Sequence, residues 1–107
     1  MENFKNQNFC LINDLSSLTL NSFLRTLEDK EIRNIFLYSK SLLQLKDQIN
    51  LDKLESAAKE VPLNIYYCKK SADKINLFLK PPFLAAGLGQ LVEFTILSKN
   101  SLVIGAL

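Results

Sequence analysis

Residues 51–68, LDKLESAAKEVPLNIYYC, place a helical pattern, a proline and a strand pattern in direct succession. The apolar positions of the first part recur at helical spacing: Leu51, Leu54, Ala57, Ala58 and Val61. Pro62 ends this helix, because proline lacks the N–H group that a helix interior needs. The strand that follows contains Ile65, Tyr66 and Tyr67, which are strong strand formers. A helix of about ten residues that leads into a buried strand is typical of a βαβ unit.

Three other short apolar runs predict strands: residues 9–12, 32–38 and 101–104. Their apolar residues are nearly continuous and do not alternate with polar ones. This pattern is typical of a parallel sheet that is covered on both faces.

Helical patterns separate these strands. One helix follows Ser16 and Ser17, which are candidate N-caps, and its apolar positions are Leu20, Phe23, Leu24 and Leu27. Residues 39–50 predict a packed loop or a short helix, with Asn50 as the cap of the next helix. Another helix is expected to begin at residues 71–73.

The last helix is expected to open at Gly87, after the break at Pro81 and Pro82. It carries the clearest helical stripe in the chain: Leu88, Leu91, Val92, Thr95 and Ile96. The fold class predicted from these patterns is α/β: a small three-layer domain with a mainly parallel sheet flanked by helices. At 107 residues and 48% apolar composition, residues 1–107 are expected to form one domain with its own core.

Composition excludes several classes of function. Thirteen basic against eleven acidic residues leave a net charge of +2, which is too balanced for a surface that binds nucleic acid. No apolar run is long enough to cross a membrane, and residues 1–8 lack the pattern of a signal peptide. We therefore expect no direct nucleic-acid partner, no membrane association and a cytoplasmic location.

The chain contains no histidine, which removes Ser–His and Cys–His nucleophile pairs and any histidine zinc site. Its two cysteines, Cys10 and Cys68, are too few for a four-thiolate zinc site. We expect no metal and no cofactor, so any chemistry depends on a thiol, carboxylates, lysines or the backbone. In a cytoplasmic protein, two cysteines are expected to be free thiols.

Cys68 is the candidate reactive residue. It ends a predicted strand just before Ser71, a predicted helix start, and ligands bind at the carboxyl ends of strands in open α/β sheets. The helix start and the cations of Lys69 and Lys70 favour the thiolate form. The alternative is a half-buried residue that finishes a strand. Cys10 lies inside an apolar run and is expected to be structural.

Gly87 and Gly89 open the last helix near the same edge of the sheet. They lack the third glycine of a dinucleotide-binding fingerprint, because Val92 stands in its place, and no phosphate-binding Gly-Lys-Ser/Thr follows. We interpret them as residues that let the helix start pack closely against the sheet. A basic patch of Lys69, Lys70, Lys74 and Lys80 is either a solvated face or a surface that attracts an acidic protein.

Residues 83–93, FLAAGLGQLVE, resemble a segment of the DsrE/DsrF-like family of small sulfur-relay proteins, especially the TusD/DsrE branch. Residues 35–38 resemble the family's second strand, and residues 62–65 followed by Cys68 resemble its third strand and reactive cysteine. The resemblance covers most of the chain from about Ile32 onward. Two differences stand out: Cys68 lies four residues after Asn64 instead of two, and Lys74-Ile75-Asn76 replaces the family's Arg-Gly.

The resemblance implies a sulfurtransferase-like persulfide carrier, with Cys68 as the carrying residue and Lys69, Lys70, Ser71, Gly87 and Gly89 in support. It implies donor and acceptor proteins, a homo- or hetero-oligomer, and a pathway toward tRNA 2-thiolation or sulfur oxidation. The two differences favour an alternative, a non-catalytic assembly subunit of a DsrE/F/H-type complex. A flavin or nucleotide binder is a third hypothesis, which rests on fold analogy alone.

Overall fold

A computed structural model describes residues 7–16, 19–38, 40–98 and 100–104. Within them lies one five-stranded sheet with every neighbouring pair parallel, in the order β4-β3-β2-β1-β5. The strands are β1 (Asn8–Ile12), β2 (Ile32–Leu37), β3 (Asn64–Cys68), β4 (Phe83–Ala86) and β5 (Asn100–Ile104). The α/β class is confirmed, and the sheet is parallel throughout.

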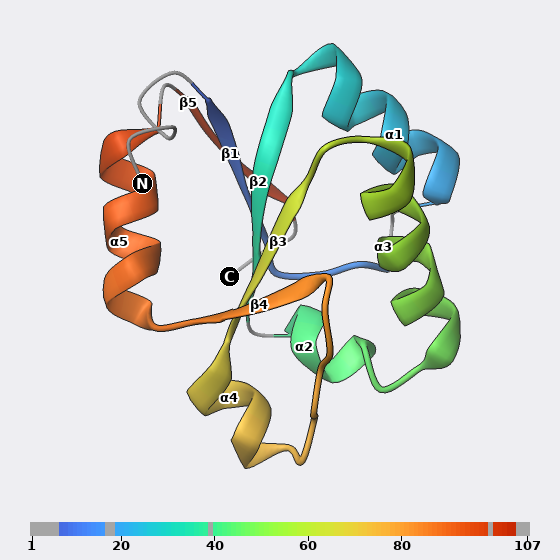
Figure 1. Cartoon of the computed structure of the whole chain (residues 1–107), viewed down its shortest axis with the longest axis vertical. Helices are drawn as coiled ribbons and strands as arrows, with labels where there is room; N and C mark the ends of the chain where they lie inside the picture. The colour runs from blue at the N-terminus through green and yellow to red at the C-terminus, as the bar shows by residue number, and fades with distance from the viewer. Residues whose placement is uncertain (1–6, 17–18, 39, 99, 105–107) are drawn as a thin grey trace.

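The helices lie on both sides of the sheet. They are α1 (Leu20–Asp29), α2 (Lys40–Gln44), α3 (Gln48–Glu60), α4 (Lys69–Lys74) and α5 (Leu88–Leu97). Figure 1 shows α1 and α3 on one side of the sheet and α5 on the other, with α2 and α4 near one end of the strands. The helices α1 and α3 contact each other, and so do α2 and α4.

Both faces of the central strands are buried. The face toward α1 and α3 is completely apolar in its centre: Cys10, Ile12, Ile35, Leu37, Ile65 and Tyr67 are all buried. On the opposite face, Phe9 and Phe36 are fully buried, and both rings pack edge-to-face against Phe94 of α5. This burial on both faces explains why the sequences of the central strands are nearly continuous apolar runs.

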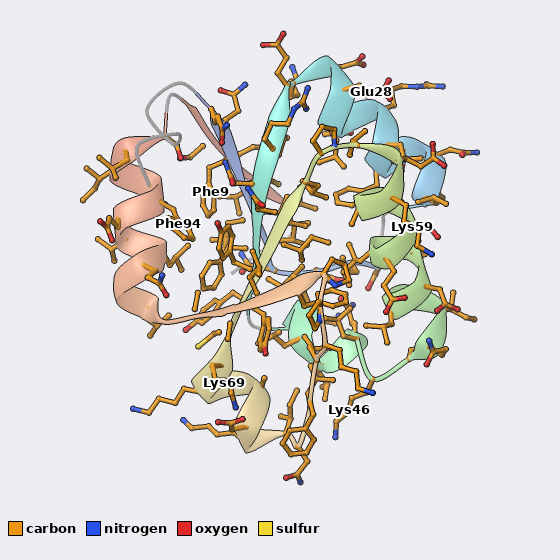
Figure 2. All side chains as sticks on the ribbon, viewed as in Figure 1. Phe9, Glu28, Lys46, Lys59, Lys69 and Phe94 are labelled. Atoms are coloured by element: carbon orange, nitrogen blue, oxygen red, sulfur yellow. The ribbon has the colours of Figure 1, made fainter. Side chains whose placement is uncertain are left out.

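The side chain of Phe94 is the only fully buried one on α5 (Figure 2). The stripe expected from the sequence faces solvent instead, with Leu88 51%, Val92 56% and Ile96 73% exposed. The predicted helix is confirmed, but most of the predicted apolar stripe lies on its outer face, and the inner face carries Phe94 together with the partly buried Leu91 and Leu97.

Two predicted caps are wrong. Thr19 caps α1, with its hydroxyl accepting from the Ser22 N–H and the Ser22 hydroxyl accepting from the Thr19 N–H, and Ser16 lies outside the helix. Ser17 lies outside the described residues. Asp47 caps α3 through the Ile49 N–H, while Asn50 donates from its amide to the Gln44 carbonyl. In both cases a nearby residue with an equally good capping side chain takes the position.

Residues 83–86 form β4, a strand that the sequence patterns did not predict. It is a four-residue edge strand with the sequence FLAA, in which only Phe83 and Ala86 are buried, and alanine is a weak strand former. It pairs with β3 in the register Cys68↔Ala86, which brings the ends of these two strands together.

The loop after β1 is held against α2 by polar contacts. Asp14 accepts hydrogen bonds from the N–H and hydroxyl of Ser16 and from the amide of Gln44, and it forms an ion pair with Lys40 at 3.3 Å. The hydrogen bond from the Ser16 hydroxyl, followed by the one from Gln44, lowers the pKa of the Asp14 carboxyl well below its usual range. The Leu15 N–H donates to the Gln44 side chain at 2.6 Å.

Candidate functional site

Cys68 is the last residue of β3 and the N-cap residue of α4. Its neighbours across the sheet are the ends of β2 and β4, so it lies at the carboxyl edge of the strands, where α/β proteins bind ligands. The side chain is 2% exposed. Any reagent must therefore reach the sulfur past a neighbouring side chain.

Ser71 is that neighbour. Its hydroxyl donates to the Sγ atom of Cys68 across 3.3 Å. The prediction that α4 begins at residues 71–73 is wrong, because the helix already begins at Lys69 and Ser71 is its third residue. One helical turn returns this side chain to the N-cap position, which is why a serine at this spacing contacts the thiol.

The two lysines after Cys68 differ in their surroundings. Lys69 forms an ion pair with Asp73 at 2.6 Å, one helical turn further along. The hydrogen bond to Asp73 raises the pKa of Lys69. The positive charge of Lys69 is therefore partly neutralised by the Asp73 carboxylate on the exposed side of α4. Figure 2 shows Lys69 at the start of this helix. Lys70 is exposed.

Two hollows border this part of the fold. One is a wide opening between α4 and α5, lined by Lys69, Lys70, Asp73, Ala85, Ala86, Gly87 and Gln90. The other is a groove of about 410 Å³ between α2 and α4, which we call the α2–α4 groove; it is lined by Lys40, Leu42, Leu43, Ser71, Lys74 and Ile75. The sequence patterns did not identify this groove, because its two walls lie far apart in the chain.

Gly87 is the N-cap of α5, as expected, and its N–H donates to the Gln90 side chain at 3.0 Å. The expected close packing of Gly87 and Gly89 is wrong. A β-carbon at either position would have no atom within 4 Å. Gly87 lines the opening between α4 and α5, directly after the end of β4.

Asn76 takes the backbone conformation that favours glycine. Its φ is 55°, in the left-handed region, and the Leu77 N–H donates to the Ala72 carbonyl at 2.9 Å. This arrangement closes the end of α4, and asparagine is the residue after glycine that best tolerates it. Asparagine thus closes the end of α4 in the conformation that a glycine would take.

The other cysteine and a buried asparagine lie away from this site. Cys10 is fully buried in β1, and burial raises the pKa of its thiol to about 12. Both cysteines are free thiols. Asn13, directly after β1, is completely buried, and neither the nitrogen nor the oxygen of its side-chain amide has a hydrogen-bond partner among the residues that the structure describes.

Among the described residues, no three side chains of the metal-binding types come together. In the same parts of the chain, no helix is both long and apolar enough to span a membrane.

No protein-family model matches the chain, and no curated protein matches its sequence. The fold is similar to the crystal structure of the YchN protein from E. coli, with a TM-score of 0.65 and 15% sequence identity. The match covers 92% of this chain and 99% of YchN. At this level of sequence identity, the similarity shows a shared fold and nothing more specific.

Proposed function

We propose that this protein carries sulfur as a persulfide on Cys68. The observation that carries the proposal is the position of this thiol at the carboxyl edge of the sheet, with the Ser71 hydroxyl donating to its sulfur at 3.3 Å. A hydroxyl donor stabilises a thiolate more than a neutral thiol, because hydrogen bonds to charged groups are the stronger ones. The resemblance to DsrE/DsrF-like proteins supports the same function, and so does the likeness to YchN, whose fold is of the DsrE-like type.

The transfer is an exchange between sulfur atoms. The thiolate of Cys68 attacks the outer sulfur of a donor persulfide, R–S–SH, and a new S–S bond forms. The old S–S bond breaks, and R–S⁻ leaves with its electron pair, so no outside oxidant or reductant is needed. The same exchange in the reverse sense passes the outer sulfur to an acceptor cysteine. The pathway served is tRNA 2-thiolation or sulfur oxidation, depending on which protein supplies that acceptor.

The test is intact-mass spectrometry of the folded protein after incubation with a small persulfide donor. Wild type and Cys10→Ser are expected to gain about 32 Da, the mass of one sulfur in a persulfide cap, and a reductant removes it. Cys68→Ser is expected to gain nothing. An adduct that persists in Cys68→Ser, or no adduct on any variant, would contradict the proposal.

A second function, a non-catalytic assembly subunit, is favoured by the exposed apolar stripe on α5. Leu88, Val92 and Ile96 are each more than half exposed and lie one turn apart. A charge-free stripe of this kind is a surface that other subunits cover. This function predicts that Val92→Asp disrupts a complex isolated from cells, whereas Cys68→Ser leaves both the complex and the sulfur flux intact.

A further inference from the structure

The α2–α4 groove ends one side chain away from the Cys68 sulfur. Ser71 lines the groove, and its hydroxyl is hydrogen-bonded to the Sγ atom of Cys68. Cys68 itself is 2% exposed, so Ser71 connects the lining of the groove to a thiol that solvent barely reaches.

The groove combines apolar walls with positive charge. Leu43 is 56% exposed on one wall, and Ile75 is partly exposed on the other. Lys40 and Lys74 lie at its sides, and no Asp or Glu lines it in the described part of the chain, although Lys40 also forms an ion pair with Asp14, which lies outside the groove lining. An exposed leucine between two cations is complementary to a segment that carries an apolar side chain flanked by carboxylates.

The opening between α4 and α5 has a different character. It is lined by alanines and glycine, and its Lys69 is already paired with Asp73. Neither Cys68 nor Ser71 lines it. Unlike the α2–α4 groove, this opening has a carboxylate in its own lining, that of Asp73.

We propose that the protein which exchanges sulfur with Cys68 docks an acidic, partly apolar segment in the α2–α4 groove. The partner's cysteine approaches past Ser71, its carboxylates lie beside Lys40 and Lys74, and its apolar side chain packs on Leu43. This inference rests on the proposed function. It places the docking role on Lys74, one of the four lysines of the basic patch, and on Lys40 of the facing helix.

The route is tested by blocking each hollow in a Cys10→Ser background. Leu43→Trp fills the α2–α4 groove, and Gln90→Trp fills the other opening. The native Leu43 side chain is exposed, and the native Gln90 side chain is partly exposed. The rate of sulfur uptake from a small neutral persulfide is measured by mass spectrometry, with unfolding curves to verify that each variant folds. Leu43→Trp is expected to slow uptake at least fivefold, and Gln90→Trp to change it less than twofold. The reverse pattern would overturn the route.

The charge is tested with two peptide persulfides. One carries two aspartates and a leucine beside its cysteine, and the other has asparagines in place of the aspartates. Lys74→Glu is expected to slow uptake from the acidic peptide about tenfold and to leave the neutral peptide unchanged. Lys59→Glu, on the exposed side of α3, is the matched control and is expected to change neither.

Failure of this inference is distinguishable from failure of the proposed function. Equal rates for Lys74→Glu and Lys59→Glu, with normal uptake at Cys68, would overturn the docking surface alone. No uptake at Cys68 in the wild type, from any of these donors, would overturn the carrier function and the docking surface together.

Discussion

The ring of Phe94 in α5 lies 4.7 Å, centroid to centroid, from the ring of Tyr66 in β3. Together with Phe9 and Phe36, this contact joins α5 to three neighbouring strands. A large aromatic side chain that is 0% exposed has the greatest effect on stability when it is truncated.

Phe94→Ala is expected to lower the free energy of unfolding by about 3–5 kcal/mol, because it removes buried surface and leaves a cavity. Urea denaturation followed by circular dichroism measures this change. Ile96→Ala, on the exposed side of the same helix, is the control and is expected to change it by less than about 0.5 kcal/mol. Similar losses in the two variants would mean that α5 is oriented differently.

Asn13→Val is expected to stabilise the protein by about 1 kcal/mol, because a buried amide without partners costs about 1–3 kcal/mol. The backbone bonds of residue 13, to Ile104 and Ser41, are retained in the variant. Asn34→Val is the matched control. Asn34 is about as buried as Asn13, but its side-chain amide is hydrogen-bonded to Gln7 and Asn64. Asn34→Val is therefore expected to destabilise the protein. A loss of stability in Asn13→Val would show that its amide has a partner in solution.

The pKa of about 12 for Cys10 makes stability depend on pH at the alkaline end. An exposed thiol in the unfolded chain has a pKa of about 8.5. Because the folded pKa is the higher one, this stabilisation is fully present below about pH 8.5 and is lost as the pH rises toward 12.

Cys10→Val is therefore expected to unfold with a smaller alkaline decline than the wild type, measured by urea titrations at pH 7 and pH 10. Alkylation gives an independent readout. Native Cys10 is expected to stay unmodified at pH 8 and to react only in denaturant. Rapid labelling of Cys10 in the folded protein would contradict its burial.

The contacts of Asp14 predict slow hydrogen exchange in the loop after β1. Asp14→Ala removes the acceptor of the Ser16 N–H and one partner of Gln44, so exchange at the Leu15 and Ser16 amides is expected to accelerate. Asp52→Ala, an exposed change on α3, is the control. Because the pKa of Asp14 is lowered in the folded protein, its stabilising effect is present at neutral pH and is lost as the pH falls below about 4. Unchanged exchange in Asp14→Ala would show that the loop is held by other contacts.

The central part of the fold was predictable from the sequence because its strands are buried on both faces. Residues 32–38 and 63–68 contain apolar runs that fit no other environment, and the corresponding strands β2 and β3 lie in the middle of the sheet. The edge strand β4 was missed for the opposite reason. Two of its four residues are exposed, and two of the four are alanines, which are weak strand formers, so this short apolar segment did not stand out as a strand.

For the candidate site, the sequence predicted the place of Cys68 but not its surroundings. Its position at a strand end follows from local patterns. The contact with Ser71 depends on where α4 begins, and a helix start can shift by two residues without a change in pattern. The α2–α4 groove depends on two helices about 30 residues apart in the chain, and no spacing in one sequence reports that contact.

The strand order has a consequence for synthesis of the protein on the ribosome. β1 is made first, and it pairs with β2 on one side and with β5, the last strand in chain order, on the other. Until residues 100–104 have emerged, the nascent chain therefore displays β1 as an open, charge-free edge, which is a template for pairing with other chains. Aggregation during translation is thus a hazard that ends only when β5 is added.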